Sequence, residues 1–273
     1  MPELPEVETV RCQLEAALIG ADFISVESVE PSMLRDCNAG EVVQGLPGRQ
    51  IEAVQRLGKF LIVRLHGDAY LTLHLGMTGQ ILIDPADASL YTRFAFHMRA
   101  KAGLERTLAF RDMRKFGRLH FTQGGPAPRL AALGPDAWRG TWDTEYLRGR
   151  LRGRSAPLKA FLLDQRQLAG IGNIYADEIL WWTELSPLRP GGSVTDDEAE
   201  LLAGEIPKRL GEGVKFLGCS FSDFVDVQGK RGEFQDWLRA YGKQGQTCGR
   251  CGGTFVRAVV AGRGTSYCPS CQH

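Results

Sequence analysis

The sequence predicts an α+β fold, in which an N-terminal β-sandwich with a flanking helix precedes a helical region and a β-hairpin module held by cysteines. Three observations predict this class. Apolar residues recur at helical spacing over 5–19, short alternating strands fill the stretch from about 51 to 122, and two C-x-x-C pairs lie in the tail from 248. A chain of 273 residues is long enough for more than one core.

The first helix and the strands are predicted from two different spacings of apolar residues along the sequence. The helix over 5–19 is expected to end at Gly20 and to bury one apolar face, formed by Val7, Val10, Leu14 and Leu18. In the strand region, leucines at every second position of 71–75 alternate with Thr72 and His74. Apolar residues at every second position also occur at Phe94 and Phe96 and at Leu108 and Phe110. Together these patterns indicate a β-sandwich with the helix packed beside it.

A Gly- and Pro-rich stretch over 123–143 is typical of a hinge between domains. Helices are expected after it over 157–168 and 174–183. They are joined by a Gly-Ile-Gly-Asn turn over 170–173, in which Asn173 is expected to cap the second helix.

One more helix is expected to open at Thr195, where Glu198 completes a capping box. Pro207 inside this helix predicts a kink or a break. We therefore divide the chain into a β-sandwich domain, a helical domain and a cysteine module, over 2–133, 134–236 and 237–273.

The net charge of +1 conceals charge segregation along the chain. Residues 1–30 carry seven acidic residues and one arginine, a net −6, whereas residues 101–166 carry fourteen basic and six acidic residues, a net +8. Residues 237–273 carry five basic residues and no acidic one. Such blocks are more often solvated surface when they stand alone, but together with a binding motif they favour a polyanionic partner.

No apolar run reaches the length of a membrane span, and the N-terminal MPELPEVETV has no apolar signal region. We therefore expect a cytoplasmic protein without a membrane partner, associated with the nucleoid in a bacterium. The seven cysteines should stay reduced in that compartment unless a metal holds them.

The tail carries the strongest local motif. Its two C-x-x-C pairs are separated by sixteen residues, which is the spacing of a zinc ribbon, and the ligands are Cys248, Cys251, Cys268 and Cys271. The sequence therefore predicts one structural Zn²⁺. Between the pairs, Gly-Arg-Gly at 262–264 predicts a hairpin with Arg263 at its tip, where an arginine without a nearby acid suits a phosphate. The other cysteines, Cys12, Cys37 and Cys219, are interpreted as small apolar residues.

Removal of Met1 would make Pro2 the N-terminus, with a secondary amine. An α-amino group titrates near pH ~8, and the positive end of the following helix lowers that value further. Such an amine can attack an aldehydic carbon and form an iminium, which acidifies the neighbouring carbon for elimination. Glu3 is the adjacent candidate acid or base. Taken alone, however, the same residues also describe a simple helix cap.

Six motifs occur in one order along nearly the whole chain: MPELPEVET at 1–9, LGK at 57–59, HLGM at 74–77, D-x-R-x-F-G at 112–117, GIGNIY at 170–175 and the four-cysteine finger. This set strongly resembles the bacterial formamidopyrimidine-DNA glycosylase family. The resemblance implies a bifunctional glycosylase and abasic-site lyase of base-excision repair. It would remove oxidised purines, namely 8-oxoguanine and formamidopyrimidines, from duplex DNA as a monomer, and its helical domain would be a helix–two-turn–helix.

The resemblance also implies roles for single residues. Pro2 resembles the Schiff-base nucleophile and Glu3 its proton-transfer partner, Lys59 the proton donor for β-elimination, and Arg263 the finger arginine of δ-elimination. Three residues resemble the trio that fills the gap left by an everted base, which suits a thioether, a planar cation and a ring: Met77, Arg114 and Phe116. Further DNA contacts are implied for His74, Tyr91, Arg154, Lys159 and Asn173.

Two positions depart from the family pattern. Tyr91 stands where a histidine is usual. The stretch LGCSFSDF over 217–224 has Ser222 in place of a cation, in the loop that closes over the everted base in the family. Two other interpretations stay open: an endonuclease VIII-like enzyme for oxidised pyrimidines, and a zinc-ribbon DNA-binding protein without catalysis. Glu3-Leu4-Pro5 favours the purine-directed branch, because endonuclease VIII proteins usually begin Pro-Glu-Gly-Pro.

Overall fold

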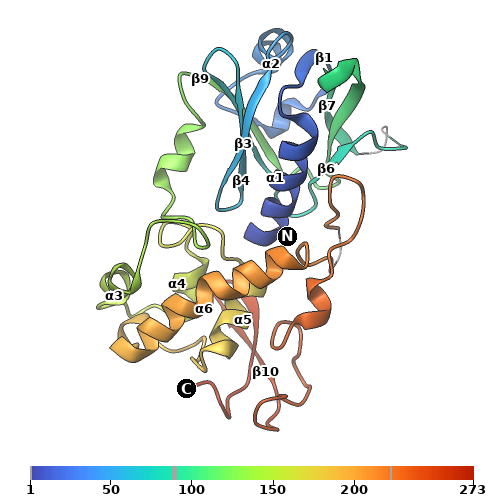
Figure 1. The fold of residues 1–273 in the computed structure, drawn as a ribbon. Helices are drawn as coiled ribbons and strands as arrows, with labels where there is room; N and C mark the ends of the chain where they lie inside the picture. Colours follow the sequence, from blue (N-terminus) through green and yellow to red (C-terminus); the bar gives the residue numbers. More distant parts are fainter. Residues whose placement is uncertain (1, 88–90, 222) are drawn as a thin grey trace. The chain divides into compact units, whose positions relative to one another are not determined.

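The computed structural model describes residues 2–87, 91–221 and 223–273 (Figure 1). Its contacts divide the chain into two compact units, one formed by Met1–Ala131 with Val214–Gln235 and the other by Ala132–Gly213 with Asp236–His273. The boundary after Ala131 lies inside the Gly- and Pro-rich stretch. The division joins 214–235 to the strand region, while the three-domain scheme drawn from the sequence stays a prediction. No helix in the described part of the chain is long and apolar enough to cross a membrane.

In the first unit, α1 (Leu4–Leu18) forms where the first helix is predicted. Proline in its first turn costs no hydrogen bond there, because the first backbone N–H groups of a helix have no partner within it. The helix stops before Gly20, whose φ of 79° places the chain in the left-handed region. The N–H of Gly20 then donates to the carbonyl of Ile51 at 2.8 Å, and α1 lies against β3 and β4 (Figure 1).

Most of the remaining first unit is formed by two sheets. The four-stranded sheet is antiparallel and has the order β1-β7-β8-β6. The five-stranded sheet has the order β2-β9-β5-β4-β3, with β2 parallel to β9. The strands are β1 (Asp22–Val29), β2 (Leu34–Arg35), β3 (Ile51–Leu57), β4 (Phe60–Leu65), β5 (Ala69–His74), β6 (Gln80–Ile83), β7 (Thr92–Arg99), β8 (Glu105–Arg111) and β9 (Arg118–Gln123). A short helix, α2 (Ala39–Gly45), precedes β3.

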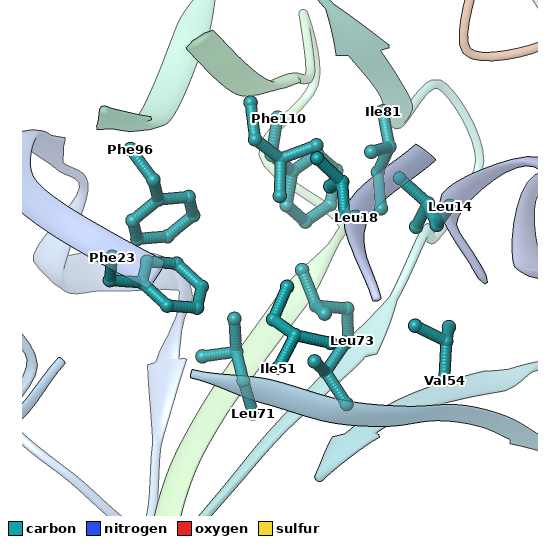
Figure 2. Close-up of a pocket in the computed structure, with 12 residues that line it drawn as sticks. Leu14, Leu18, Phe23, Ile51, Val54, Leu71, Leu73, Ile81, Phe96 and Phe110 are labelled. Atoms are coloured by element: carbon teal, nitrogen blue, oxygen red, sulfur yellow. The ribbon is translucent and has the colours of Figure 1, made fainter. Parts of the chain in front are cut away.

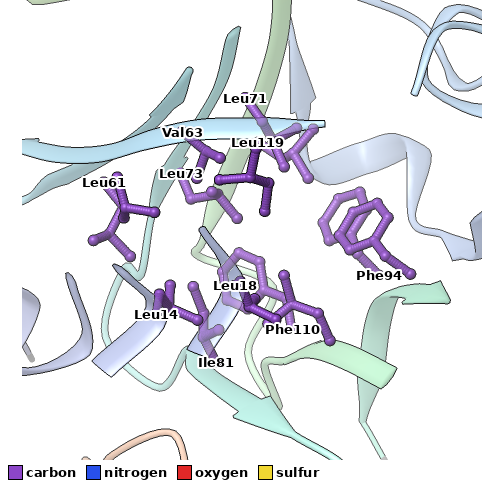
Figure 3. Packing of buried hydrophobic residues seen from close by; sticks show 14 of the residues in the cluster. Leu14, Leu18, Leu61, Val63, Leu71, Leu73, Ile81, Phe94, Phe110 and Leu119 are labelled. Atoms are coloured by element: carbon purple, nitrogen blue, oxygen red, sulfur yellow. The ribbon is translucent and has the colours of Figure 1, made fainter. Parts of the chain in front are cut away.

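Apolar side chains of both sheets and of α1 meet in one core, which confirms the predicted β-sandwich with its flanking helix (Figure 3). Phe23 and Phe96 pack edge to face with ring centroids 5.6 Å apart, the geometry that aromatic quadrupoles favour. The same core encloses a cavity of about 20 Å³ lined only by apolar residues, among them Leu14, Leu73 and Phe110 (Figure 2). A cavity without polar partners does not retain an ordered water, so it is a packing defect.

The segment over 214–235 joins this core although it lies far from it in sequence. Phe224 and Val227 are buried among the sandwich side chains. The Gln13 side chain of α1 donates to Asp226 Oδ2 at 2.9 Å and accepts the N–H of Val227 at 3.1 Å. The carbonyl of Val227 in turn accepts the N–H of Ile83 at the end of β6, at 2.9 Å. One amide side chain on α1 therefore fixes a loop more than 200 residues away.

The second unit contains four helices and a hairpin in its described residues: α3 (Thr144–Leu151), α4 (Leu158–Leu163), α5 (Asn173–Trp182), most of α6 (Asp196–Lys215), β10 (Val256–Val260) and β11 (Arg263–Tyr267). The predicted capping box of α6 is present. The N–H of Thr195 donates to Glu198 Oε2 at 2.7 Å, and the N–H of Glu198 donates to Thr195 Oγ1 at 3.3 Å.

Two local predictions for this unit are wrong, and a third is wrong in part. α4 ends at Leu163 rather than near 168, because the carbonyl of Asp164 accepts the N–H of Gln167 in a turn. The N-cap of α5 is Gly172, and Asn173 is the first helical residue. α6 does not break at Pro207, because a proline removes only one backbone hydrogen bond and buried residues on both sides hold the helix in the core. The predicted kink at this position stays a prediction.

Candidate active site and nucleic-acid interface

The N-terminal residues are buried at the start of α1. Pro2 is buried, and Glu3 is the N-cap residue with 1% of its surface exposed. The N–H of Glu3 donates to Glu6 Oε2 at 2.7 Å, and Glu6 Oε1 accepts the N–H of Cys219 at 2.7 Å. Glu6, which the sequence did not single out, therefore links the start of the helix to the 217–224 loop. Ser222 of that loop lies outside the described residues.

Lys59 lies on the two-residue turn between β3 and β4. Gly58 has φ 56°, the conformation that a tight hairpin turn requires at its first central residue. Arg56 holds this turn from inside, since its Nη1 donates to the carbonyl of Gly58 at 3.0 Å. Its Nε donates to Glu8 Oε2 at 2.8 Å, and both side chains of the pair are 3% exposed. Glu8 belongs to α1, so a buried ion pair connects the helix that follows Pro2 and Glu3 with the turn that carries Lys59.

His74 ends β5 near this turn and is held in its neutral form. Burial first, and then the positive charge of Lys59, lower the pKa of His74 to about 4. Its Nδ1 accepts the N–H of Gly76 at 3.1 Å. A neutral imidazole with Nδ1 as acceptor carries its proton on Nε2, so it can donate a hydrogen bond to a phosphate oxygen without being charged.

The Met77 and Arg114–Phe116 loops lie next to each other in the first unit. Phe116 is 43% exposed, which excludes a place in the strand core. The Arg114 guanidinium lies over the Phe116 ring at 4.5 Å from its centroid. A partly exposed aromatic ring with a cation over it can stack against another flat group.

Tyr91 lies beside the same loops. It is 41% exposed and has φ 63°, uncommon for a residue with a Cβ atom. Its carbonyl accepts the N–H of Asp112 at 3.0 Å, and the Arg93 guanidinium lies 5.8 Å from the centroid of its ring. The position that departs from the family pattern is thus attached to the D-x-R-x-F-G turn.

The second unit holds the other predicted contacts, which are exposed to different degrees. Arg154 is partly exposed in the loop after α3, where its Nε donates to the carbonyl of Arg150 at 2.7 Å. Arg263 is exposed and begins β11, paired with Val260. The tip of the hairpin is Ala261-Gly262, with φ 49° and 71°, so Arg263 stands beside the tip rather than on it.

The prediction that Lys159 contacts DNA directly is wrong, because its side chain is 0% exposed. Its Nζ lies 2.7 Å from Asp177 Oδ1 and donates to the carbonyl of Gly264 at 3.1 Å. Asn173 Nδ2 donates to the same carbonyl at 3.0 Å. Burial raises the pKa of Asp177 above its ordinary range, while the ammonium of Lys159 acts in the opposite direction. Both predicted contacts therefore hold the backbone of the finger next to Arg263.

The four cysteines of the tail come together as a metal site. Their Sγ atoms all lie within 4.8 Å of one another, with 3.8 Å between Cys248 and Cys271 and 3.4 Å between Cys251 and Cys268. Four thiolates at about 2.3 Å from a tetrahedral zinc are separated by similar distances, so the site fits one structural Zn²⁺. Trp181 Nε1 donates to Cys248 Sγ at 3.5 Å, the kind of outer contact that orients a ligand. Among the other cysteines, which were interpreted as small apolar residues, Cys219 is buried, Cys37 is partly buried and Cys12 is exposed.

Comparison with known proteins covers the whole chain. Family models match the formamidopyrimidine-DNA glycosylase N-terminal domain at residues 1–119, its helix–two-turn–helix domain at 133–224, and the zinc finger found in this glycosylase and isoleucyl-tRNA synthetase at 245–273. A formamidopyrimidine-DNA glycosylase of Carboxydothermus hydrogenoformans is 40% identical over 100% of both chains.

Solved structures of the Lactococcus lactis enzyme are also similar. A variant bound to DNA containing Fapy-dG is 32% identical, with a TM-score of 0.90 over 100% of both chains. The complex with DNA containing an abasic site has a TM-score of 0.88 over 99% of both chains, again at 32% identity. The sequence motifs, the two described units and these matches agree, and the chain belongs to the formamidopyrimidine-DNA glycosylase family.

Proposed function

We propose that this chain, a base-excision-repair glycosylase, removes oxidised purines from duplex DNA and then cleaves the abasic strand. The observation that carries the proposal is the arrangement at the start of α1. Pro2 and Glu3 are buried there, and the Glu8–Arg56 ion pair connects the same helix to the Lys59 turn. A binding module needs neither a free N-terminal amine nor a lysine held in this way.

The chemistry follows from the groups present once Met1 has been removed. The Pro2 nitrogen forms a bond to C1′ of the damaged nucleotide as the bond from C1′ to the base breaks, and the departing base takes up a proton. Glu3 is the residue placed to transfer protons in this step. Opening of the sugar gives an iminium, and loss of a C2′ proton then expels the 3′-phosphate oxygen. Lys59 serves this β-elimination, and Arg263 serves the second elimination on the 5′ side.

The DNA is held by separate sets of residues on the two units. His74, Arg114 and Tyr91 contact the DNA from the first unit, where Met77 and Phe116 fill the emptied stack. Arg154, Asn173 and Arg263 contact phosphates from the second unit, where Lys159 supports the backbone of the finger. We further propose that the protein acts as a monomer, in the cytoplasm and in association with the nucleoid.

Borohydride trapping tests the proposal. Protein without Met1 should form a covalent adduct with a duplex containing 8-oxoguanine, and the adduct should map to the N-terminal peptide. A duplex with an oxidised pyrimidine should trap less, and an undamaged duplex should not trap. Stronger trapping on the pyrimidine would support the endonuclease VIII-like interpretation. An adduct on Lys59, or no adduct in protein that binds the lesion, would overturn the assignment of Pro2.

A further inference from the structure

We infer that Asp112 and Thr78 act as positioning residues that lock the Met77 loop and the Arg114–Phe116 loop into one unit for entry into the DNA stack. The inference rests on the proposed function, since it assigns a purpose to these loops. Both residues are buried, with 1% of Asp112 and 8% of Thr78 exposed, and neither can itself contact DNA.

The Asp112 carboxylate organises its own turn through the backbone. Its Oδ1 accepts the N–H of Arg114 at 3.1 Å, and its Oδ2 accepts the N–H of Gly117 at 2.7 Å. These two bonds fix both ends of the segment that carries Arg114 and Phe116. The carboxylate thus holds the peptide of Arg114, while the guanidinium lies over the Phe116 ring.

Thr78 ties the second loop to that turn. Its hydroxyl donates to Asp112 Oδ1 and also accepts the N–H of Arg114 at 3.3 Å. Thr78 directly follows Met77, so one hydroxyl connects the thioether loop with the loop that carries the cation and the ring. A buried carboxylate that accepts three hydrogen bonds holds a loop more firmly than neutral partners do.

The backbones of the two loops also touch. Gly76 has φ 65°, and a Cβ atom placed on it would lie 2.5 Å from the carbonyl carbon of Phe116 and 2.6 Å from the nitrogen of Gly117. No side chain fits there. The conformation at Gly76 and the Asp112–Thr78 contact therefore hold the loops together from both sides. Residues fixed in this way before binding lose less conformational entropy when they enter the duplex.

The test uses Asp112→Asn and Thr78→Val, with Thr78→Ser as the conservative variant. The matched control is Thr72→Val, because Thr72 is likewise buried in the first unit and its hydroxyl has no hydrogen-bond partner among the described residues. Two quantities are measured. The first is the rate of duplex opening at 8-oxoguanine, followed by 2-aminopurine fluorescence opposite the lesion. The second is borohydride trapping on a single-stranded abasic oligonucleotide, which has no stack to fill.

Asp112→Asn and Thr78→Val should slow duplex opening by about tenfold or more, the effect of one lost charge-assisted hydrogen bond. Single-strand trapping should fall much less. Thr78→Ser should recover the opening rate, and Thr72→Val should match the wild type. Equal losses on both substrates, or no loss on either, would overturn the inference. Failure of the proposed function looks different, because the wild-type protein itself would then not trap the abasic oligonucleotide.

Discussion

Two buried ion pairs, one in each unit, support a candidate catalytic cation in the same manner. In the first unit, Arg56 donates to the carbonyl of Gly58, next to Lys59, and pairs with Glu8 of α1. In the second, Lys159 donates to the carbonyl of Gly264, next to Arg263, and pairs with Asp177 of α5. Each pair thus connects a helix to the backbone beside a functional side chain.

The two pairs differ in the sequence separation between the cation and the carbonyl that it holds, and in the number of cations that pair with the carboxylate. Arg56 lies two residues from the carbonyl it holds, whereas Lys159 lies 105 residues from Gly264. Glu8 also pairs with Arg11, at 3.0 Å, while Asp177 has Lys159 as its only salt-bridge partner among the described residues. Loss of the basic residue should therefore destabilise the protein less at the Arg56–Glu8 pair, where Arg11 remains beside Glu8, than at the Lys159–Asp177 pair, where no second cation remains.

The largest effect is expected from Lys159→Met, which leaves Asp177 buried without its cation. Breaking such a pair costs about 3–5 kcal/mol of unfolding free energy, measurable by thermal unfolding of the zinc-loaded protein. The matched control is the double variant Lys159→Met with Asp177→Leu, which replaces the pair by apolar side chains and should recover most of the stability. δ-Elimination should stay impaired in the double variant, because the Gly264 carbonyl has lost the ammonium of Lys159 and keeps only the neutral donor of Asn173. Full recovery of δ-elimination would limit the pair to a role in stability.

A smaller loss is expected from Arg56→Met, on the order of 1–3 kcal/mol, because Arg11 remains to compensate Glu8. Arg56→Met should also slow the reaction steps proposed for Pro2 and Lys59 in the first unit. Single-turnover Schiff-base formation and β-elimination should slow, while the affinity for a lesion duplex should change little. Arg56→Lys keeps the charge and should restore part of the rate. If Arg56→Met destabilises the protein more than Lys159→Met, Arg11 does not compensate the buried charge of Glu8.

The dependence of stability on pH tests the protonation state of His74 in the first unit. Since the pKa of His74 is lowered to about 4, its imidazole stays neutral throughout the physiological range. The folded state binds this proton less readily than the unfolded state does. The stability that the neutral ring contributes is therefore complete above pH ~6.5 and is lost as the pH falls towards 4. Nitrogen NMR should show a neutral ring protonated on Nε2 at pH 6, and a ring already charged at that pH would contradict the assignment.

The smallest effect is expected from filling the apolar cavity of the first unit. Val63 lines this cavity of about 20 Å³, and Val63→Ile adds one methyl group there. It should raise the free energy of unfolding by about 0.5–1 kcal/mol and leave base excision unchanged. A rise in the midpoint of thermal unfolding measures the gain. A loss of stability would show that the added methyl group overpacks the core.

Much of the fold could be predicted because its signals are local. The period of α1, the alternation in β5 and the capping box at Thr195 act over a few residues, and the structure confirms them. The errors arose where a tertiary contact overrides a local preference. α6 continues through Pro207 because buried neighbours hold it, and α4 stops early because Asp164 starts a turn. No local pattern indicates that 214–235 packs with the sandwich.

In the candidate site too, features with a local sequence signal could be predicted, and features that depend on tertiary contacts could not. The zinc site could be predicted from the chain alone, because the spacing of four thiolates indicates a tetrahedral ion, and so could the residues that precede the first helix and lie on the turns. The three-dimensional structure was needed to show that Lys159 is an internal support, that Glu8 and Arg56 brace the Lys59 turn, and that Asp112 and Thr78 join two loops. The reason is physical: a charge removed from water must find its partner in space, and the partner can come from any part of the chain.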